Sequence, residues 1–511
     1  MRNGSMIEDG RKGVSARMAL GLALLAILLA ELALCISPEG FAGGPSDDQR
    51  YFDIALDWYL HGPQPGTTHW ALRVPLIAAV TGAFHLLGPT ISALLVVPRL
   101  FYALFVGVTG ATIARTFGMR VFGLWLAFVI ASPVLHEMAT SCFPEMVELS
   151  LGAASVAAFL AARRASATQP RLLWMVAAGI ALGLAVLTRE TAGFVAIGYL
   201  WFGLRRPGMP RALYAAMAAA FLLPIAAHVG WLWWLTGDPL YRLHVDAHHI
   251  LIPSDHLEGK VYTGGSPFLN FDLARRWVPA GPTRIHWALN PLLDFLIDPA
   301  FGFVLLGCAL AALPWFSGHP RARIPRAATV LLWAIGIGSY VTVTWLFTLR
   351  PQPRYYLPVI CAGQIAFALM IATRLARAEL KRRAAVLTAL VLIGGIVPIL
   401  VTRDAGWQAK LLVPYMAAHP GGYTSTDEHV AGRAKTPALA MGLVPPRLGP
   451  DAPIGEYRVR LIKKSELRRR RPLTTDPRYR AVARLDQPLP WLIRQLFPDK
   501  HDALLIERRV R

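Results

Sequence analysis

The chain has 511 residues, of which 55% are hydrophobic and 16% are charged, and its mean hydropathy is +0.43. A soluble protein carries roughly a quarter charged residues, so the composition excludes an ordinary water-soluble protein and favours a membrane protein. The net charge of +21 lies largely in short loops between apolar runs, which argues against nucleic acid as a partner. The four cysteines show no C-x-x-C spacing and indicate neither disulfides nor a thiolate metal site.

The first predicted element is a membrane span at about 17–36, preceded by a basic, cytoplasmic N-terminus at 1–16. Its apolar run is too long for a signal peptide, and no clear cleavage site follows it. Ten further apolar runs approach the roughly 20 residues that a helix needs to cross the membrane. They lie at 91–113, 121–135, 146–162, 172–187, 191–204, 212–235, 300–316, 327–348, 355–373 and 384–402. The sequence therefore predicts an all-α polytopic membrane domain at 17–402 with about 11 transmembrane helices.

The segment 74–88 is apolar but short for a span. If it crossed the membrane completely, Arg115 and Arg120 would face outside and every later basic loop would lie on the wrong side. We therefore predict a partly inserted or re-entrant helix there. Membranes accept that geometry only where protein or a cavity covers the open backbone ends.

Pairs of basic residues mark the cytoplasmic side of the predicted topology. They are Arg163/Arg164, Arg205/Arg206, Arg321/Arg323 and Arg382/Arg383. The polar regions on the opposite, outer face are 38–73, 136–145, 237–299 and 349–354. The stretch 403–511 leaves the membrane on the same face, and its strand-like pieces EYRVRLI and DALLIERRV predict a small α/β domain outside the membrane.

The first outer loop contains Asp47 and Asp48, just before a predicted amphipathic helix. Tyr51, Ala55 and Trp58 recur there at helical spacing. We expect this helix to lie flat at the membrane interface with its aromatic face among the headgroups, which would hold the two aspartates near the surface. The alternative is that Asp47 and Asp48 only cap the N-terminus of the helix, where aspartate accepts hydrogen bonds from backbone N–H groups that have no partner within the helix.

A second acidic point, Glu145 with Glu148, lies at the outer end of the span at 146–162. An ionisable side chain at a membrane boundary is costly and is therefore a candidate functional residue. Because Glu145 directly follows Pro144, its alternative role is to start the helix or to reach the headgroups. Glu148 lies one turn deeper, and its alternative is an ion pair with a basic residue inside the bundle.

Four arginines fall on the same outer face: Arg73, Arg189, Arg350 and Arg354. The planar guanidinium fork matches phosphate oxygens in two-point contacts, so several arginines around one cavity suit a phosphorylated ligand. The alternative is that each arginine anchors a helix end among the headgroups. That alternative is strongest for Arg350 and weakest for Arg189, which lies between two apolar runs.

The third outer loop carries His244 and His248, which would share one zinc ion if the stretch were helical. No H-E-x-x-H pattern is present, and loop histidines more often form hydrogen bonds, so we predict no metal ligands. The sequence also contains no Walker loop, no G-x-S-x-G and no G-x-G-x-x-G after a strand. A soluble nucleotide is therefore not the expected substrate.

Four short motifs occur in one order and on one face: D-D-x-x-Y from Asp47, P-E-x-x-x-L from Pro144, L-T-R-E around Arg189, and R-Y-Y-L-P from Arg354. Together they resemble the GT-C glycosyltransferases over roughly 17–400. The resemblance is closest to the bacterial branch related to dolichyl-phosphate-mannose protein mannosyltransferases and to the aminoarabinose transferase that modifies lipid A.

This resemblance implies an inverting membrane glycosyltransferase that moves one hexose or pentose from a polyprenyl-phosphate donor to a lipid, glycan or protein acceptor. Asp47 would be the general base with Asp48 beside it, and Glu145 would be the second acidic position, where many relatives carry aspartate. Arg189 stands where relatives often carry lysine, and with Arg354 and Arg73 it would bind the donor phosphate. The implied location is a bacterial inner membrane, with the site facing the periplasm. A divalent cation as cofactor stays open.

Two other classes of function remain open at this point. A transporter or flippase of lipid-linked sugars would also be polytopic. Such proteins tend to show internal repeats and ionisable groups near the midplane, whereas this sequence shows no clear repeat and its ionisable residues cluster at one face. A ligase or polymerase of surface polysaccharide would instead use a whole oligosaccharide on pyrophosphate. The sequence identifies neither the sugar nor the acceptor.

Overall fold

The computed structural model describes most of the chain. The described residues are 14–35, 47–205, 208–249, 277–280, 283–286, 296, 301–312, 326–343, 353–401, 406–467, 476–489, 495 and 501–511. Arg350 and most of 250–300 lie outside this part of the chain.

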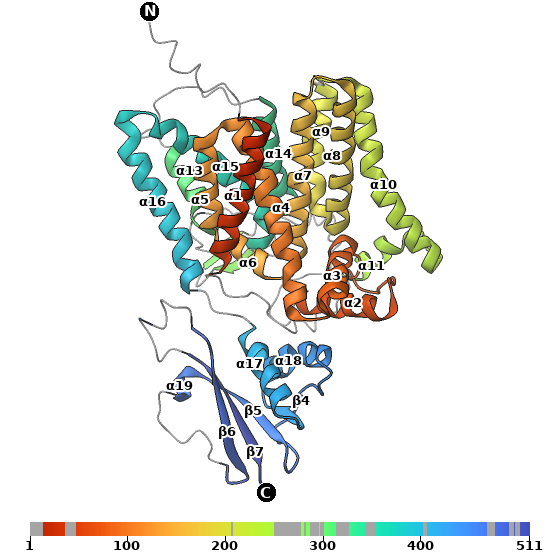
Figure 1. Cartoon of the computed structure of the whole chain (residues 1–511), viewed down its shortest axis with the longest axis vertical. Coiled ribbons are helices and arrows are strands. Elements are labelled where there is room, and N and C mark those ends of the chain that lie inside the picture. The colour runs from red at the N-terminus through yellow and green to blue at the C-terminus, as the bar shows by residue number, and fades with distance from the viewer. Residues whose placement is uncertain are drawn as a thin grey trace, which may run out of the picture.

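A bundle of long helices forms the body of the molecule (Figure 1). Its members are α1 (Ala16–Leu34), α4 (Ile91–Phe117), α5 (Met119–Ile130), α7 (Pro144–Arg164), α8 (Thr168–Thr188), α9 (Phe194–Arg205), α10 (Arg211–Thr236), α13 (Val304–Ala312), α14 (Arg326–Val341), α15 (Leu357–Leu375) and α16 (Ala378–Val401). Each overlaps one of the predicted spans. The fold class predicted from the sequence, a polytopic helical membrane protein, is confirmed.

Seven of the described helices are long and apolar enough to cross a membrane alone: α1, α4, α7, α8, α10, α15 (counted with the 3-10 turn that precedes it) and α16. The helix α5 passes the same test only together with α6 (Pro133–Thr140), to which it is bent by 65°. In the described residues α9, α13 and α14 are shorter, so the predicted total of 11 crossings stays a prediction.

The two faces of α1 indicate that the bundle lies in lipid. Leu20, Leu24 and Leu28 are 62%, 60% and 56% exposed on its outer face. Ala26 and Ala30 on the opposite face are fully buried, where α1 packs against α4. Large apolar residues outside and small ones at the helix contact are the arrangement expected in lipid, where close approach of backbones drives helix association.

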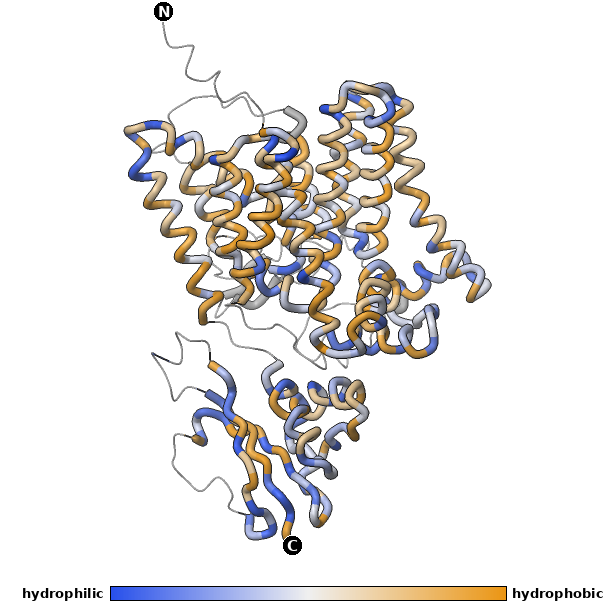
Figure 2. The backbone as a smooth tube through the Cα atoms, in the orientation of Figure 1, coloured by the Kyte–Doolittle hydropathy of each residue, from blue (hydrophilic) through white to orange (hydrophobic). Residues whose placement is uncertain are grey.

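Short elements gather at one end of the bundle, which we call the α2 end (Figure 1). They are α2 (Asp47–His61), α3 (Val74–Leu87), α6 and α11 (Tyr241–His249). The 14-residue helix α3 is too short to cross a membrane, in agreement with the prediction for 74–88. Hydrophilic residues lie at both ends of the bundle, while its middle is hydrophobic (Figure 2).

The expected orientation of α2 was wrong in one respect. Its aromatic face does not lie among headgroups, because Tyr51, Phe52 and Trp58 are at most 5% exposed. They pack in one core cluster with Ile77 and Phe84 of α3. Protein covers this face because α3 presents an apolar surface of its own, and burying two apolar faces together removes both from solvent.

A separate α/β unit follows the bundle at the α2 end (Figure 1). Its elements are α17 (Trp407–Ala418), β3 (Tyr423–Ser425), α18 (Glu428–Ala440), β4 (Arg447–Leu448), β5 (Tyr457–Ile462), α19 (Lys464–Leu467), β6 (Tyr479–Asp486) and β7 (Ala503–Arg509). The strands form one sheet in the order β4-β3-β5-β7-β6. The two predicted strands are β5 and β7, which pair antiparallel in the centre. A two-stranded hairpin, β1 (Trp277–Ala280) with β2 (Thr283–His286), lies in the third loop.

The α/β unit contacts the bundle through α2. The hydroxyl of Thr436 in α18 donates to Asp53 Oδ1 in α2 at 2.7 Å. The same oxygen accepts from Gln49 Nε2 at 3.0 Å. Ala440, at the end of α18, packs against the cluster that contains Trp58. The unit therefore rests on the helix that begins with Asp47.

Candidate active site

Asp47 is the first residue of α2 and is held from two sides. Its Oδ1 accepts from the indole Nε1 of Trp70 at 3.1 Å, and its Oδ2 accepts from Arg354 Nη2 at 2.9 Å. The side chain remains 33% exposed. Its partners are side chains from outside α2, so a pure capping role does not account for its contacts.

Glu145 lies in the first turn of α7, directly after Pro144, and is 4% exposed. Its Oε1 accepts from Arg189 Nη1 at 2.8 Å. Arg189 is placed there because α8 ends at Thr188 and the chain turns to an extended conformation. Two residues that are 44 positions apart thus form a buried ion pair.

Arg354 joins these two carboxylates. It lies in η8 (Pro353–Tyr356), and its Nε is 3.7 Å from Glu145 Oε1. Its guanidinium also lies 4.4 Å above the ring of Phe143, and that of Arg189 lies 4.5 Å above the ring of Tyr355. Aromatic faces attract cations most strongly when both are removed from water.

We call Asp47, Arg354, Glu145 and Arg189 the Asp47 ion-pair chain. It contains two carboxylates and two guanidiniums, and its formal charge is zero. Within the described residues, Glu145 Oε2 is buried and accepts no hydrogen bond. A ligand that brings a donor to this oxygen would satisfy it, since a buried acceptor without a partner is costly.

Asp48 does not belong to the Asp47 ion-pair chain. It is fully buried, and its Oδ1 accepts from the backbone N–H of Gln49 at 2.9 Å. The two aspartates of the motif therefore have different surroundings. Asp47 is partly accessible, whereas Asp48 is packed beneath the start of α2.

Arg73 lies in a second group of charges, which we call the Glu190 cluster. Its Nη1 donates to Glu190 Oε2 at 2.6 Å, and Arg242 in α11 donates to Glu190 Oε1. Arg242 Nε also lies 3.9 Å from Asp246 Oδ2. Neither Glu190 nor Arg242 was among the predicted site residues, although Glu190 stands next to Arg189 in the L-T-R-E motif.

The Glu190 cluster shifts the protonation of its two carboxyl groups in opposite directions. Burial alone would raise the pKa of Glu190, but Arg73 and Arg242 outweigh it and hold this pKa at about 2. Burial, and then the charge of Glu190, raise the pKa of Asp246 to about 6. The cluster therefore gains net positive charge when Asp246 takes up a proton near pH 6.

One turn of 3-10 helix, η2 (Glu190–Gly193), connects the two groups of charges. Arg189 reaches the Asp47 ion-pair chain, and the next residue, Glu190, reaches Arg73. Thr191 donates to Glu148 Oε1 at 2.6 Å, so Glu148 is engaged by a hydroxyl in addition to the nearby charge of Arg189. Three consecutive residues thus place three different polar contacts around this turn.

An apolar cavity of about 120 Å³ adjoins this turn. It is lined by α4, α7, α9, α14 and α15, with Glu148 and Ala192 at its wall. Most of its lining is aliphatic or aromatic, for example Phe105, Leu149 and Ile365. The cavity therefore suits a hydrocarbon chain that approaches the charged residues from inside the bundle.

The zinc alternative for the third loop gains no support from α11. The Nδ1 atom of His244 lies 2.6 Å from Asp238 Oδ2, and the side chain of His248 is outside the described part. Across the described ranges, no three histidine, cysteine, aspartate or glutamate side chains come together as a metal site.

No protein-family model matches the sequence, and no curated protein matches it either. Among solved structures, the chain is similar to ArnT from Cupriavidus metallidurans bound to undecaprenyl phosphate, with a TM-score of 0.53 and 15% identity over 96% of this chain and 98% of that chain. The apo state of ArnT gives a TM-score of 0.49 and 14% identity over the same shares. The apo oligosaccharyltransferase of Archaeoglobus fulgidus gives 0.45 and 12%, over 80% of this chain and 59% of that chain.

The likeness to the ligand-bound ArnT structure covers nearly the whole of both chains, so it includes the helical bundle and the C-terminal α/β unit. At 15% identity it bears on the fold and not on individual residues. The chain therefore has the polytopic GT-C-like fold that its sequence predicts.

Proposed function

We propose that the chain is a membrane glycosyltransferase that moves a single sugar from a polyprenyl-phosphate donor to a lipid, glycan or protein acceptor. The observation that carries this proposal is a partly accessible carboxylate, Asp47, which pairs with Arg354 and through it is linked to Glu145 and Arg189 at the α2 end. An apolar cavity begins at Glu148, one helix turn from Glu145. The fold shared with a structure that binds undecaprenyl phosphate supports the choice of a lipid-linked donor.

Asp47 is the proposed general base. As the acceptor hydroxyl or amine attacks the anomeric carbon, its proton passes to a carboxylate oxygen of Asp47 and the bond from that carbon to the phosphate oxygen breaks. The bonding electrons leave with the phosphate, and attack from the opposite side inverts the anomeric centre. Trp70 and Arg354 each occupy one position on the carboxylate, and a carboxylate can accept about four hydrogen bonds, so positions remain for the acceptor.

Arg73, Arg189 and Arg354 are the proposed ligands of the donor phosphate. Arg73 and Arg242 share the single carboxylate of Glu190, and each guanidinium has five N–H donors, so donors remain for phosphate oxygens. Fixed cations near a leaving group stabilise the charge that grows on it in the transition state. Glu145 would hold Arg189 and Arg354 in place for this role.

The apolar cavity beside Glu148 is the proposed site for the start of the polyprenyl tail. The position of two arginines supports a periplasmic location of the α2 end. Arg163 and Arg164 end α7 at the opposite end of the bundle, where the positive-inside rule expects the cytoplasm. The α/β unit would then stand over the site on the acceptor side.

The test uses the full-length protein reconstituted with radiolabelled polyprenyl-phosphate sugars and a membrane extract as acceptor. We expect transfer by the wild type and a loss of about 10²- to 10⁴-fold in Asp47→Asn, which keeps the size of the side chain and one acceptor oxygen but cannot take the proton. Asp57→Asn is the matched control, because Asp57 is an exposed aspartate of the same helix.

Three outcomes would contradict the proposal. Label that crosses the bilayer without transfer would identify a flippase. Transfer only from an oligosaccharide on pyrophosphate would identify a ligase or polymerase. Equal activity of wild type and Asp47→Asn would remove Asp47 from the role of base.

A further inference from the structure

A row of side chains crosses the central strands of the α/β unit. Tyr457 in β5 pairs with Arg508 in β7, and Arg508 pairs in turn with Arg480 in β6. Residues paired directly across an antiparallel sheet point to the same face. Two arginines therefore stand side by side on adjacent strands, an arrangement in which like charges destabilise a sheet.

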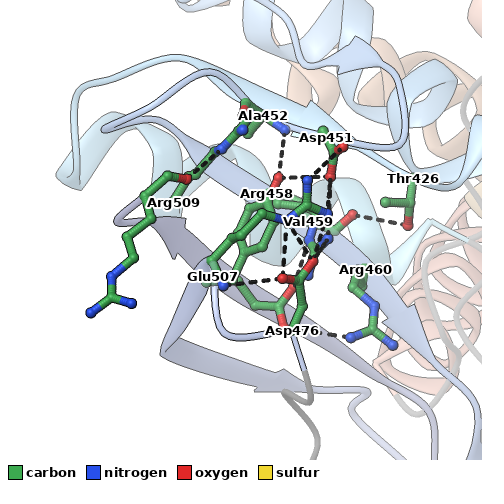
Figure 3. A network of polar contacts seen from close by, with 12 residues as sticks. Thr426, Asp451, Ala452, Arg458, Val459, Arg460, Asp476, Glu507 and Arg509 are labelled. Carbon is green, nitrogen blue, oxygen red and sulfur yellow. Dashed lines mark hydrogen bonds and ion pairs between the residues drawn. The ribbon is translucent and has the colours of Figure 1, made fainter.

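Several other arginines of the α/β unit pair with carboxylates instead. Arg458 is 7% exposed and donates through Nε to the fully buried Glu507 at 2.7 Å, and Arg460 lies 3.5 Å from the same carboxylate (Figure 3). Arg478 pairs with Asp476 at 2.8 Å. Each of these three arginines therefore has a carboxylate partner.

Arg484 follows the same pattern, because its Nε lies 2.6 Å from Asp486 Oδ1 in the same strand. Arg480 and Arg508 form no ion pair with any residue in the described part of the chain. Arg508 donates to the backbone oxygen of Gly455 at 3.2 Å and lies 5.9 Å from the ring of Tyr457. Both side chains are exposed.

Arg480 and Arg508 line a groove of about 600 Å³ together with Arg509, Tyr457 and the apolar side chains Ile454, Val482 and Val510. Val510 immediately precedes the C-terminal residue, and the C-terminus lies at the end of the α/β unit that points away from the bundle (Figure 1). The groove is therefore distinct from the Asp47 ion-pair chain and from the apolar cavity in the bundle.

We propose that this groove binds the phosphate group of a phosphorylated ligand. A phosphate between Arg480 and Arg508 would supply the negative charge that the sheet lacks there, and the guanidinium fork matches its oxygens. The volume of the groove accommodates more than a bare phosphate, and the rim of Ile454, Val482 and Val510 provides apolar contact for the rest of the ligand. The proposal does not depend on the activity proposed above.

The test measures binding by calorimetry to the full-length protein in nanodiscs of neutral lipid at low salt. The probes are glucose 1-phosphate, inorganic phosphate and glucose. We expect the wild type to bind glucose 1-phosphate, and inorganic phosphate more weakly, and not to bind glucose. Arg480→Gln and Arg508→Gln should each weaken binding of glucose 1-phosphate by at least about tenfold. Arg484→Gln is the matched control, because its charge lies in the same strand but is already paired.

A second measurement separates the proposal from a purely structural role. If the two arginines only repel one another when the groove is empty, Arg480→Gln should unfold at the same temperature as the wild type or a higher one. Vesicles of phosphatidylglycerol added to the nanodiscs distinguish a lipid headgroup from a soluble source of phosphate. If these vesicles bind the wild type but not Arg508→Gln, the source is a lipid.

Three results would overturn the proposal. One is that neither glucose 1-phosphate nor the vesicles bind the wild type more tightly than they bind Arg480→Gln and Arg508→Gln. Another is that Arg484→Gln loses binding to the same degree, because the phosphate would then be attracted by the overall charge of the α/β unit. Unfolding of Arg480→Gln at a much lower temperature than the wild type would also assign the pair to the fold.

Discussion

Replacing Glu145 by glutamine removes the buried carboxylate at the centre of the Asp47 ion-pair chain. The side chains of Glu145 and Arg189 are only 5% and 9% exposed. Glutamine has the same size and still presents an oxygen to Arg189, so the change removes charge and not volume. Removing one partner of a buried ion pair costs about 3–5 kcal/mol, because the other charge stays buried without compensation.

For Glu145→Gln we expect the free energy of unfolding to fall by about 3 kcal/mol, near the lower limit of this range. The reason is that the remaining cations keep other contacts. Arg189 still lies 4.5 Å from the ring of Tyr355, and Arg354 still donates to Asp47 at 2.9 Å. If the proposed function is correct, the rate of sugar transfer from the donor should fall as well, because Arg189 and Arg354 both lose their contact with the Glu145 carboxylate.

The assay is denaturant unfolding of the purified full-length protein in detergent, followed by circular dichroism. The wild type, Glu145→Gln, Arg189→Gln and the double variant form a thermodynamic cycle, and contacting residues typically show coupling of about 0.5–3 kcal/mol. Glu428→Gln, at an exposed position of α18, is the control and should change stability by no more than about 0.5 kcal/mol. Effects of the two single changes that simply add in the double variant would refute the idea of a coupled pair.

Four further predictions concern other parts of the molecule. The pKa of Asp246 is raised to about 6, so the contribution of this side chain to the free energy of unfolding is complete below its ordinary pKa and is lost as pH rises through about 6. Asp246→Asn should therefore make the unfolding temperature less dependent on pH between about pH 4 and 6. In the wild type, affinity for the donor should rise as pH falls through this range. Glu190 has a lowered pKa, so its contribution should persist at these pH values and be lost only as pH falls from about 4.5 through about 2. Thr436→Val removes the hydrogen bond to Asp53, which should cost about 1 kcal/mol and speed hydrogen exchange in α2, while exchange in α8 stays unchanged. Ala157→Phe fills part of the apolar cavity and should raise KM for a long-chain donor but not for a donor with a short lipid; an equal rise for both would place the tail elsewhere.

Much of the bundle could be predicted from hydropathy because lipid imposes a simple requirement. Every backbone polar group must be satisfied within its own segment, so an apolar run of sufficient length becomes a helix whatever its neighbours are. The same simplicity does not extend to amphipathic segments. The aromatic face of α2 has the same pattern whether it faces headgroups or protein, and only the position of α3 decided that it is buried against Ile77 and Phe84.

The candidate site was predictable as a set of residue types but not as a set of contacts. Asp47, Glu145, Arg189 and Arg354 were singled out by acidic or basic character at the boundaries of apolar runs, and the fold brings these four together. Their roles in catalysis stay predictions. Arg73 was expected beside them, yet it pairs with Glu190 instead.

The sequence by itself determined that this chain is a polytopic membrane protein, approximately which segments form its long helices, and which end of the bundle collects its candidate site residues. These properties depend on local composition, because burial in lipid acts on each segment separately. Tertiary structure alone decided which charges meet. Asp47 and Arg354 are 307 residues apart, and Arg242 reaches Glu190 across 52, distances over which no local pattern specifies a partner. Pairing of buried charges depends on how whole helices pack, and that packing is set by the sum of many contacts along the chain.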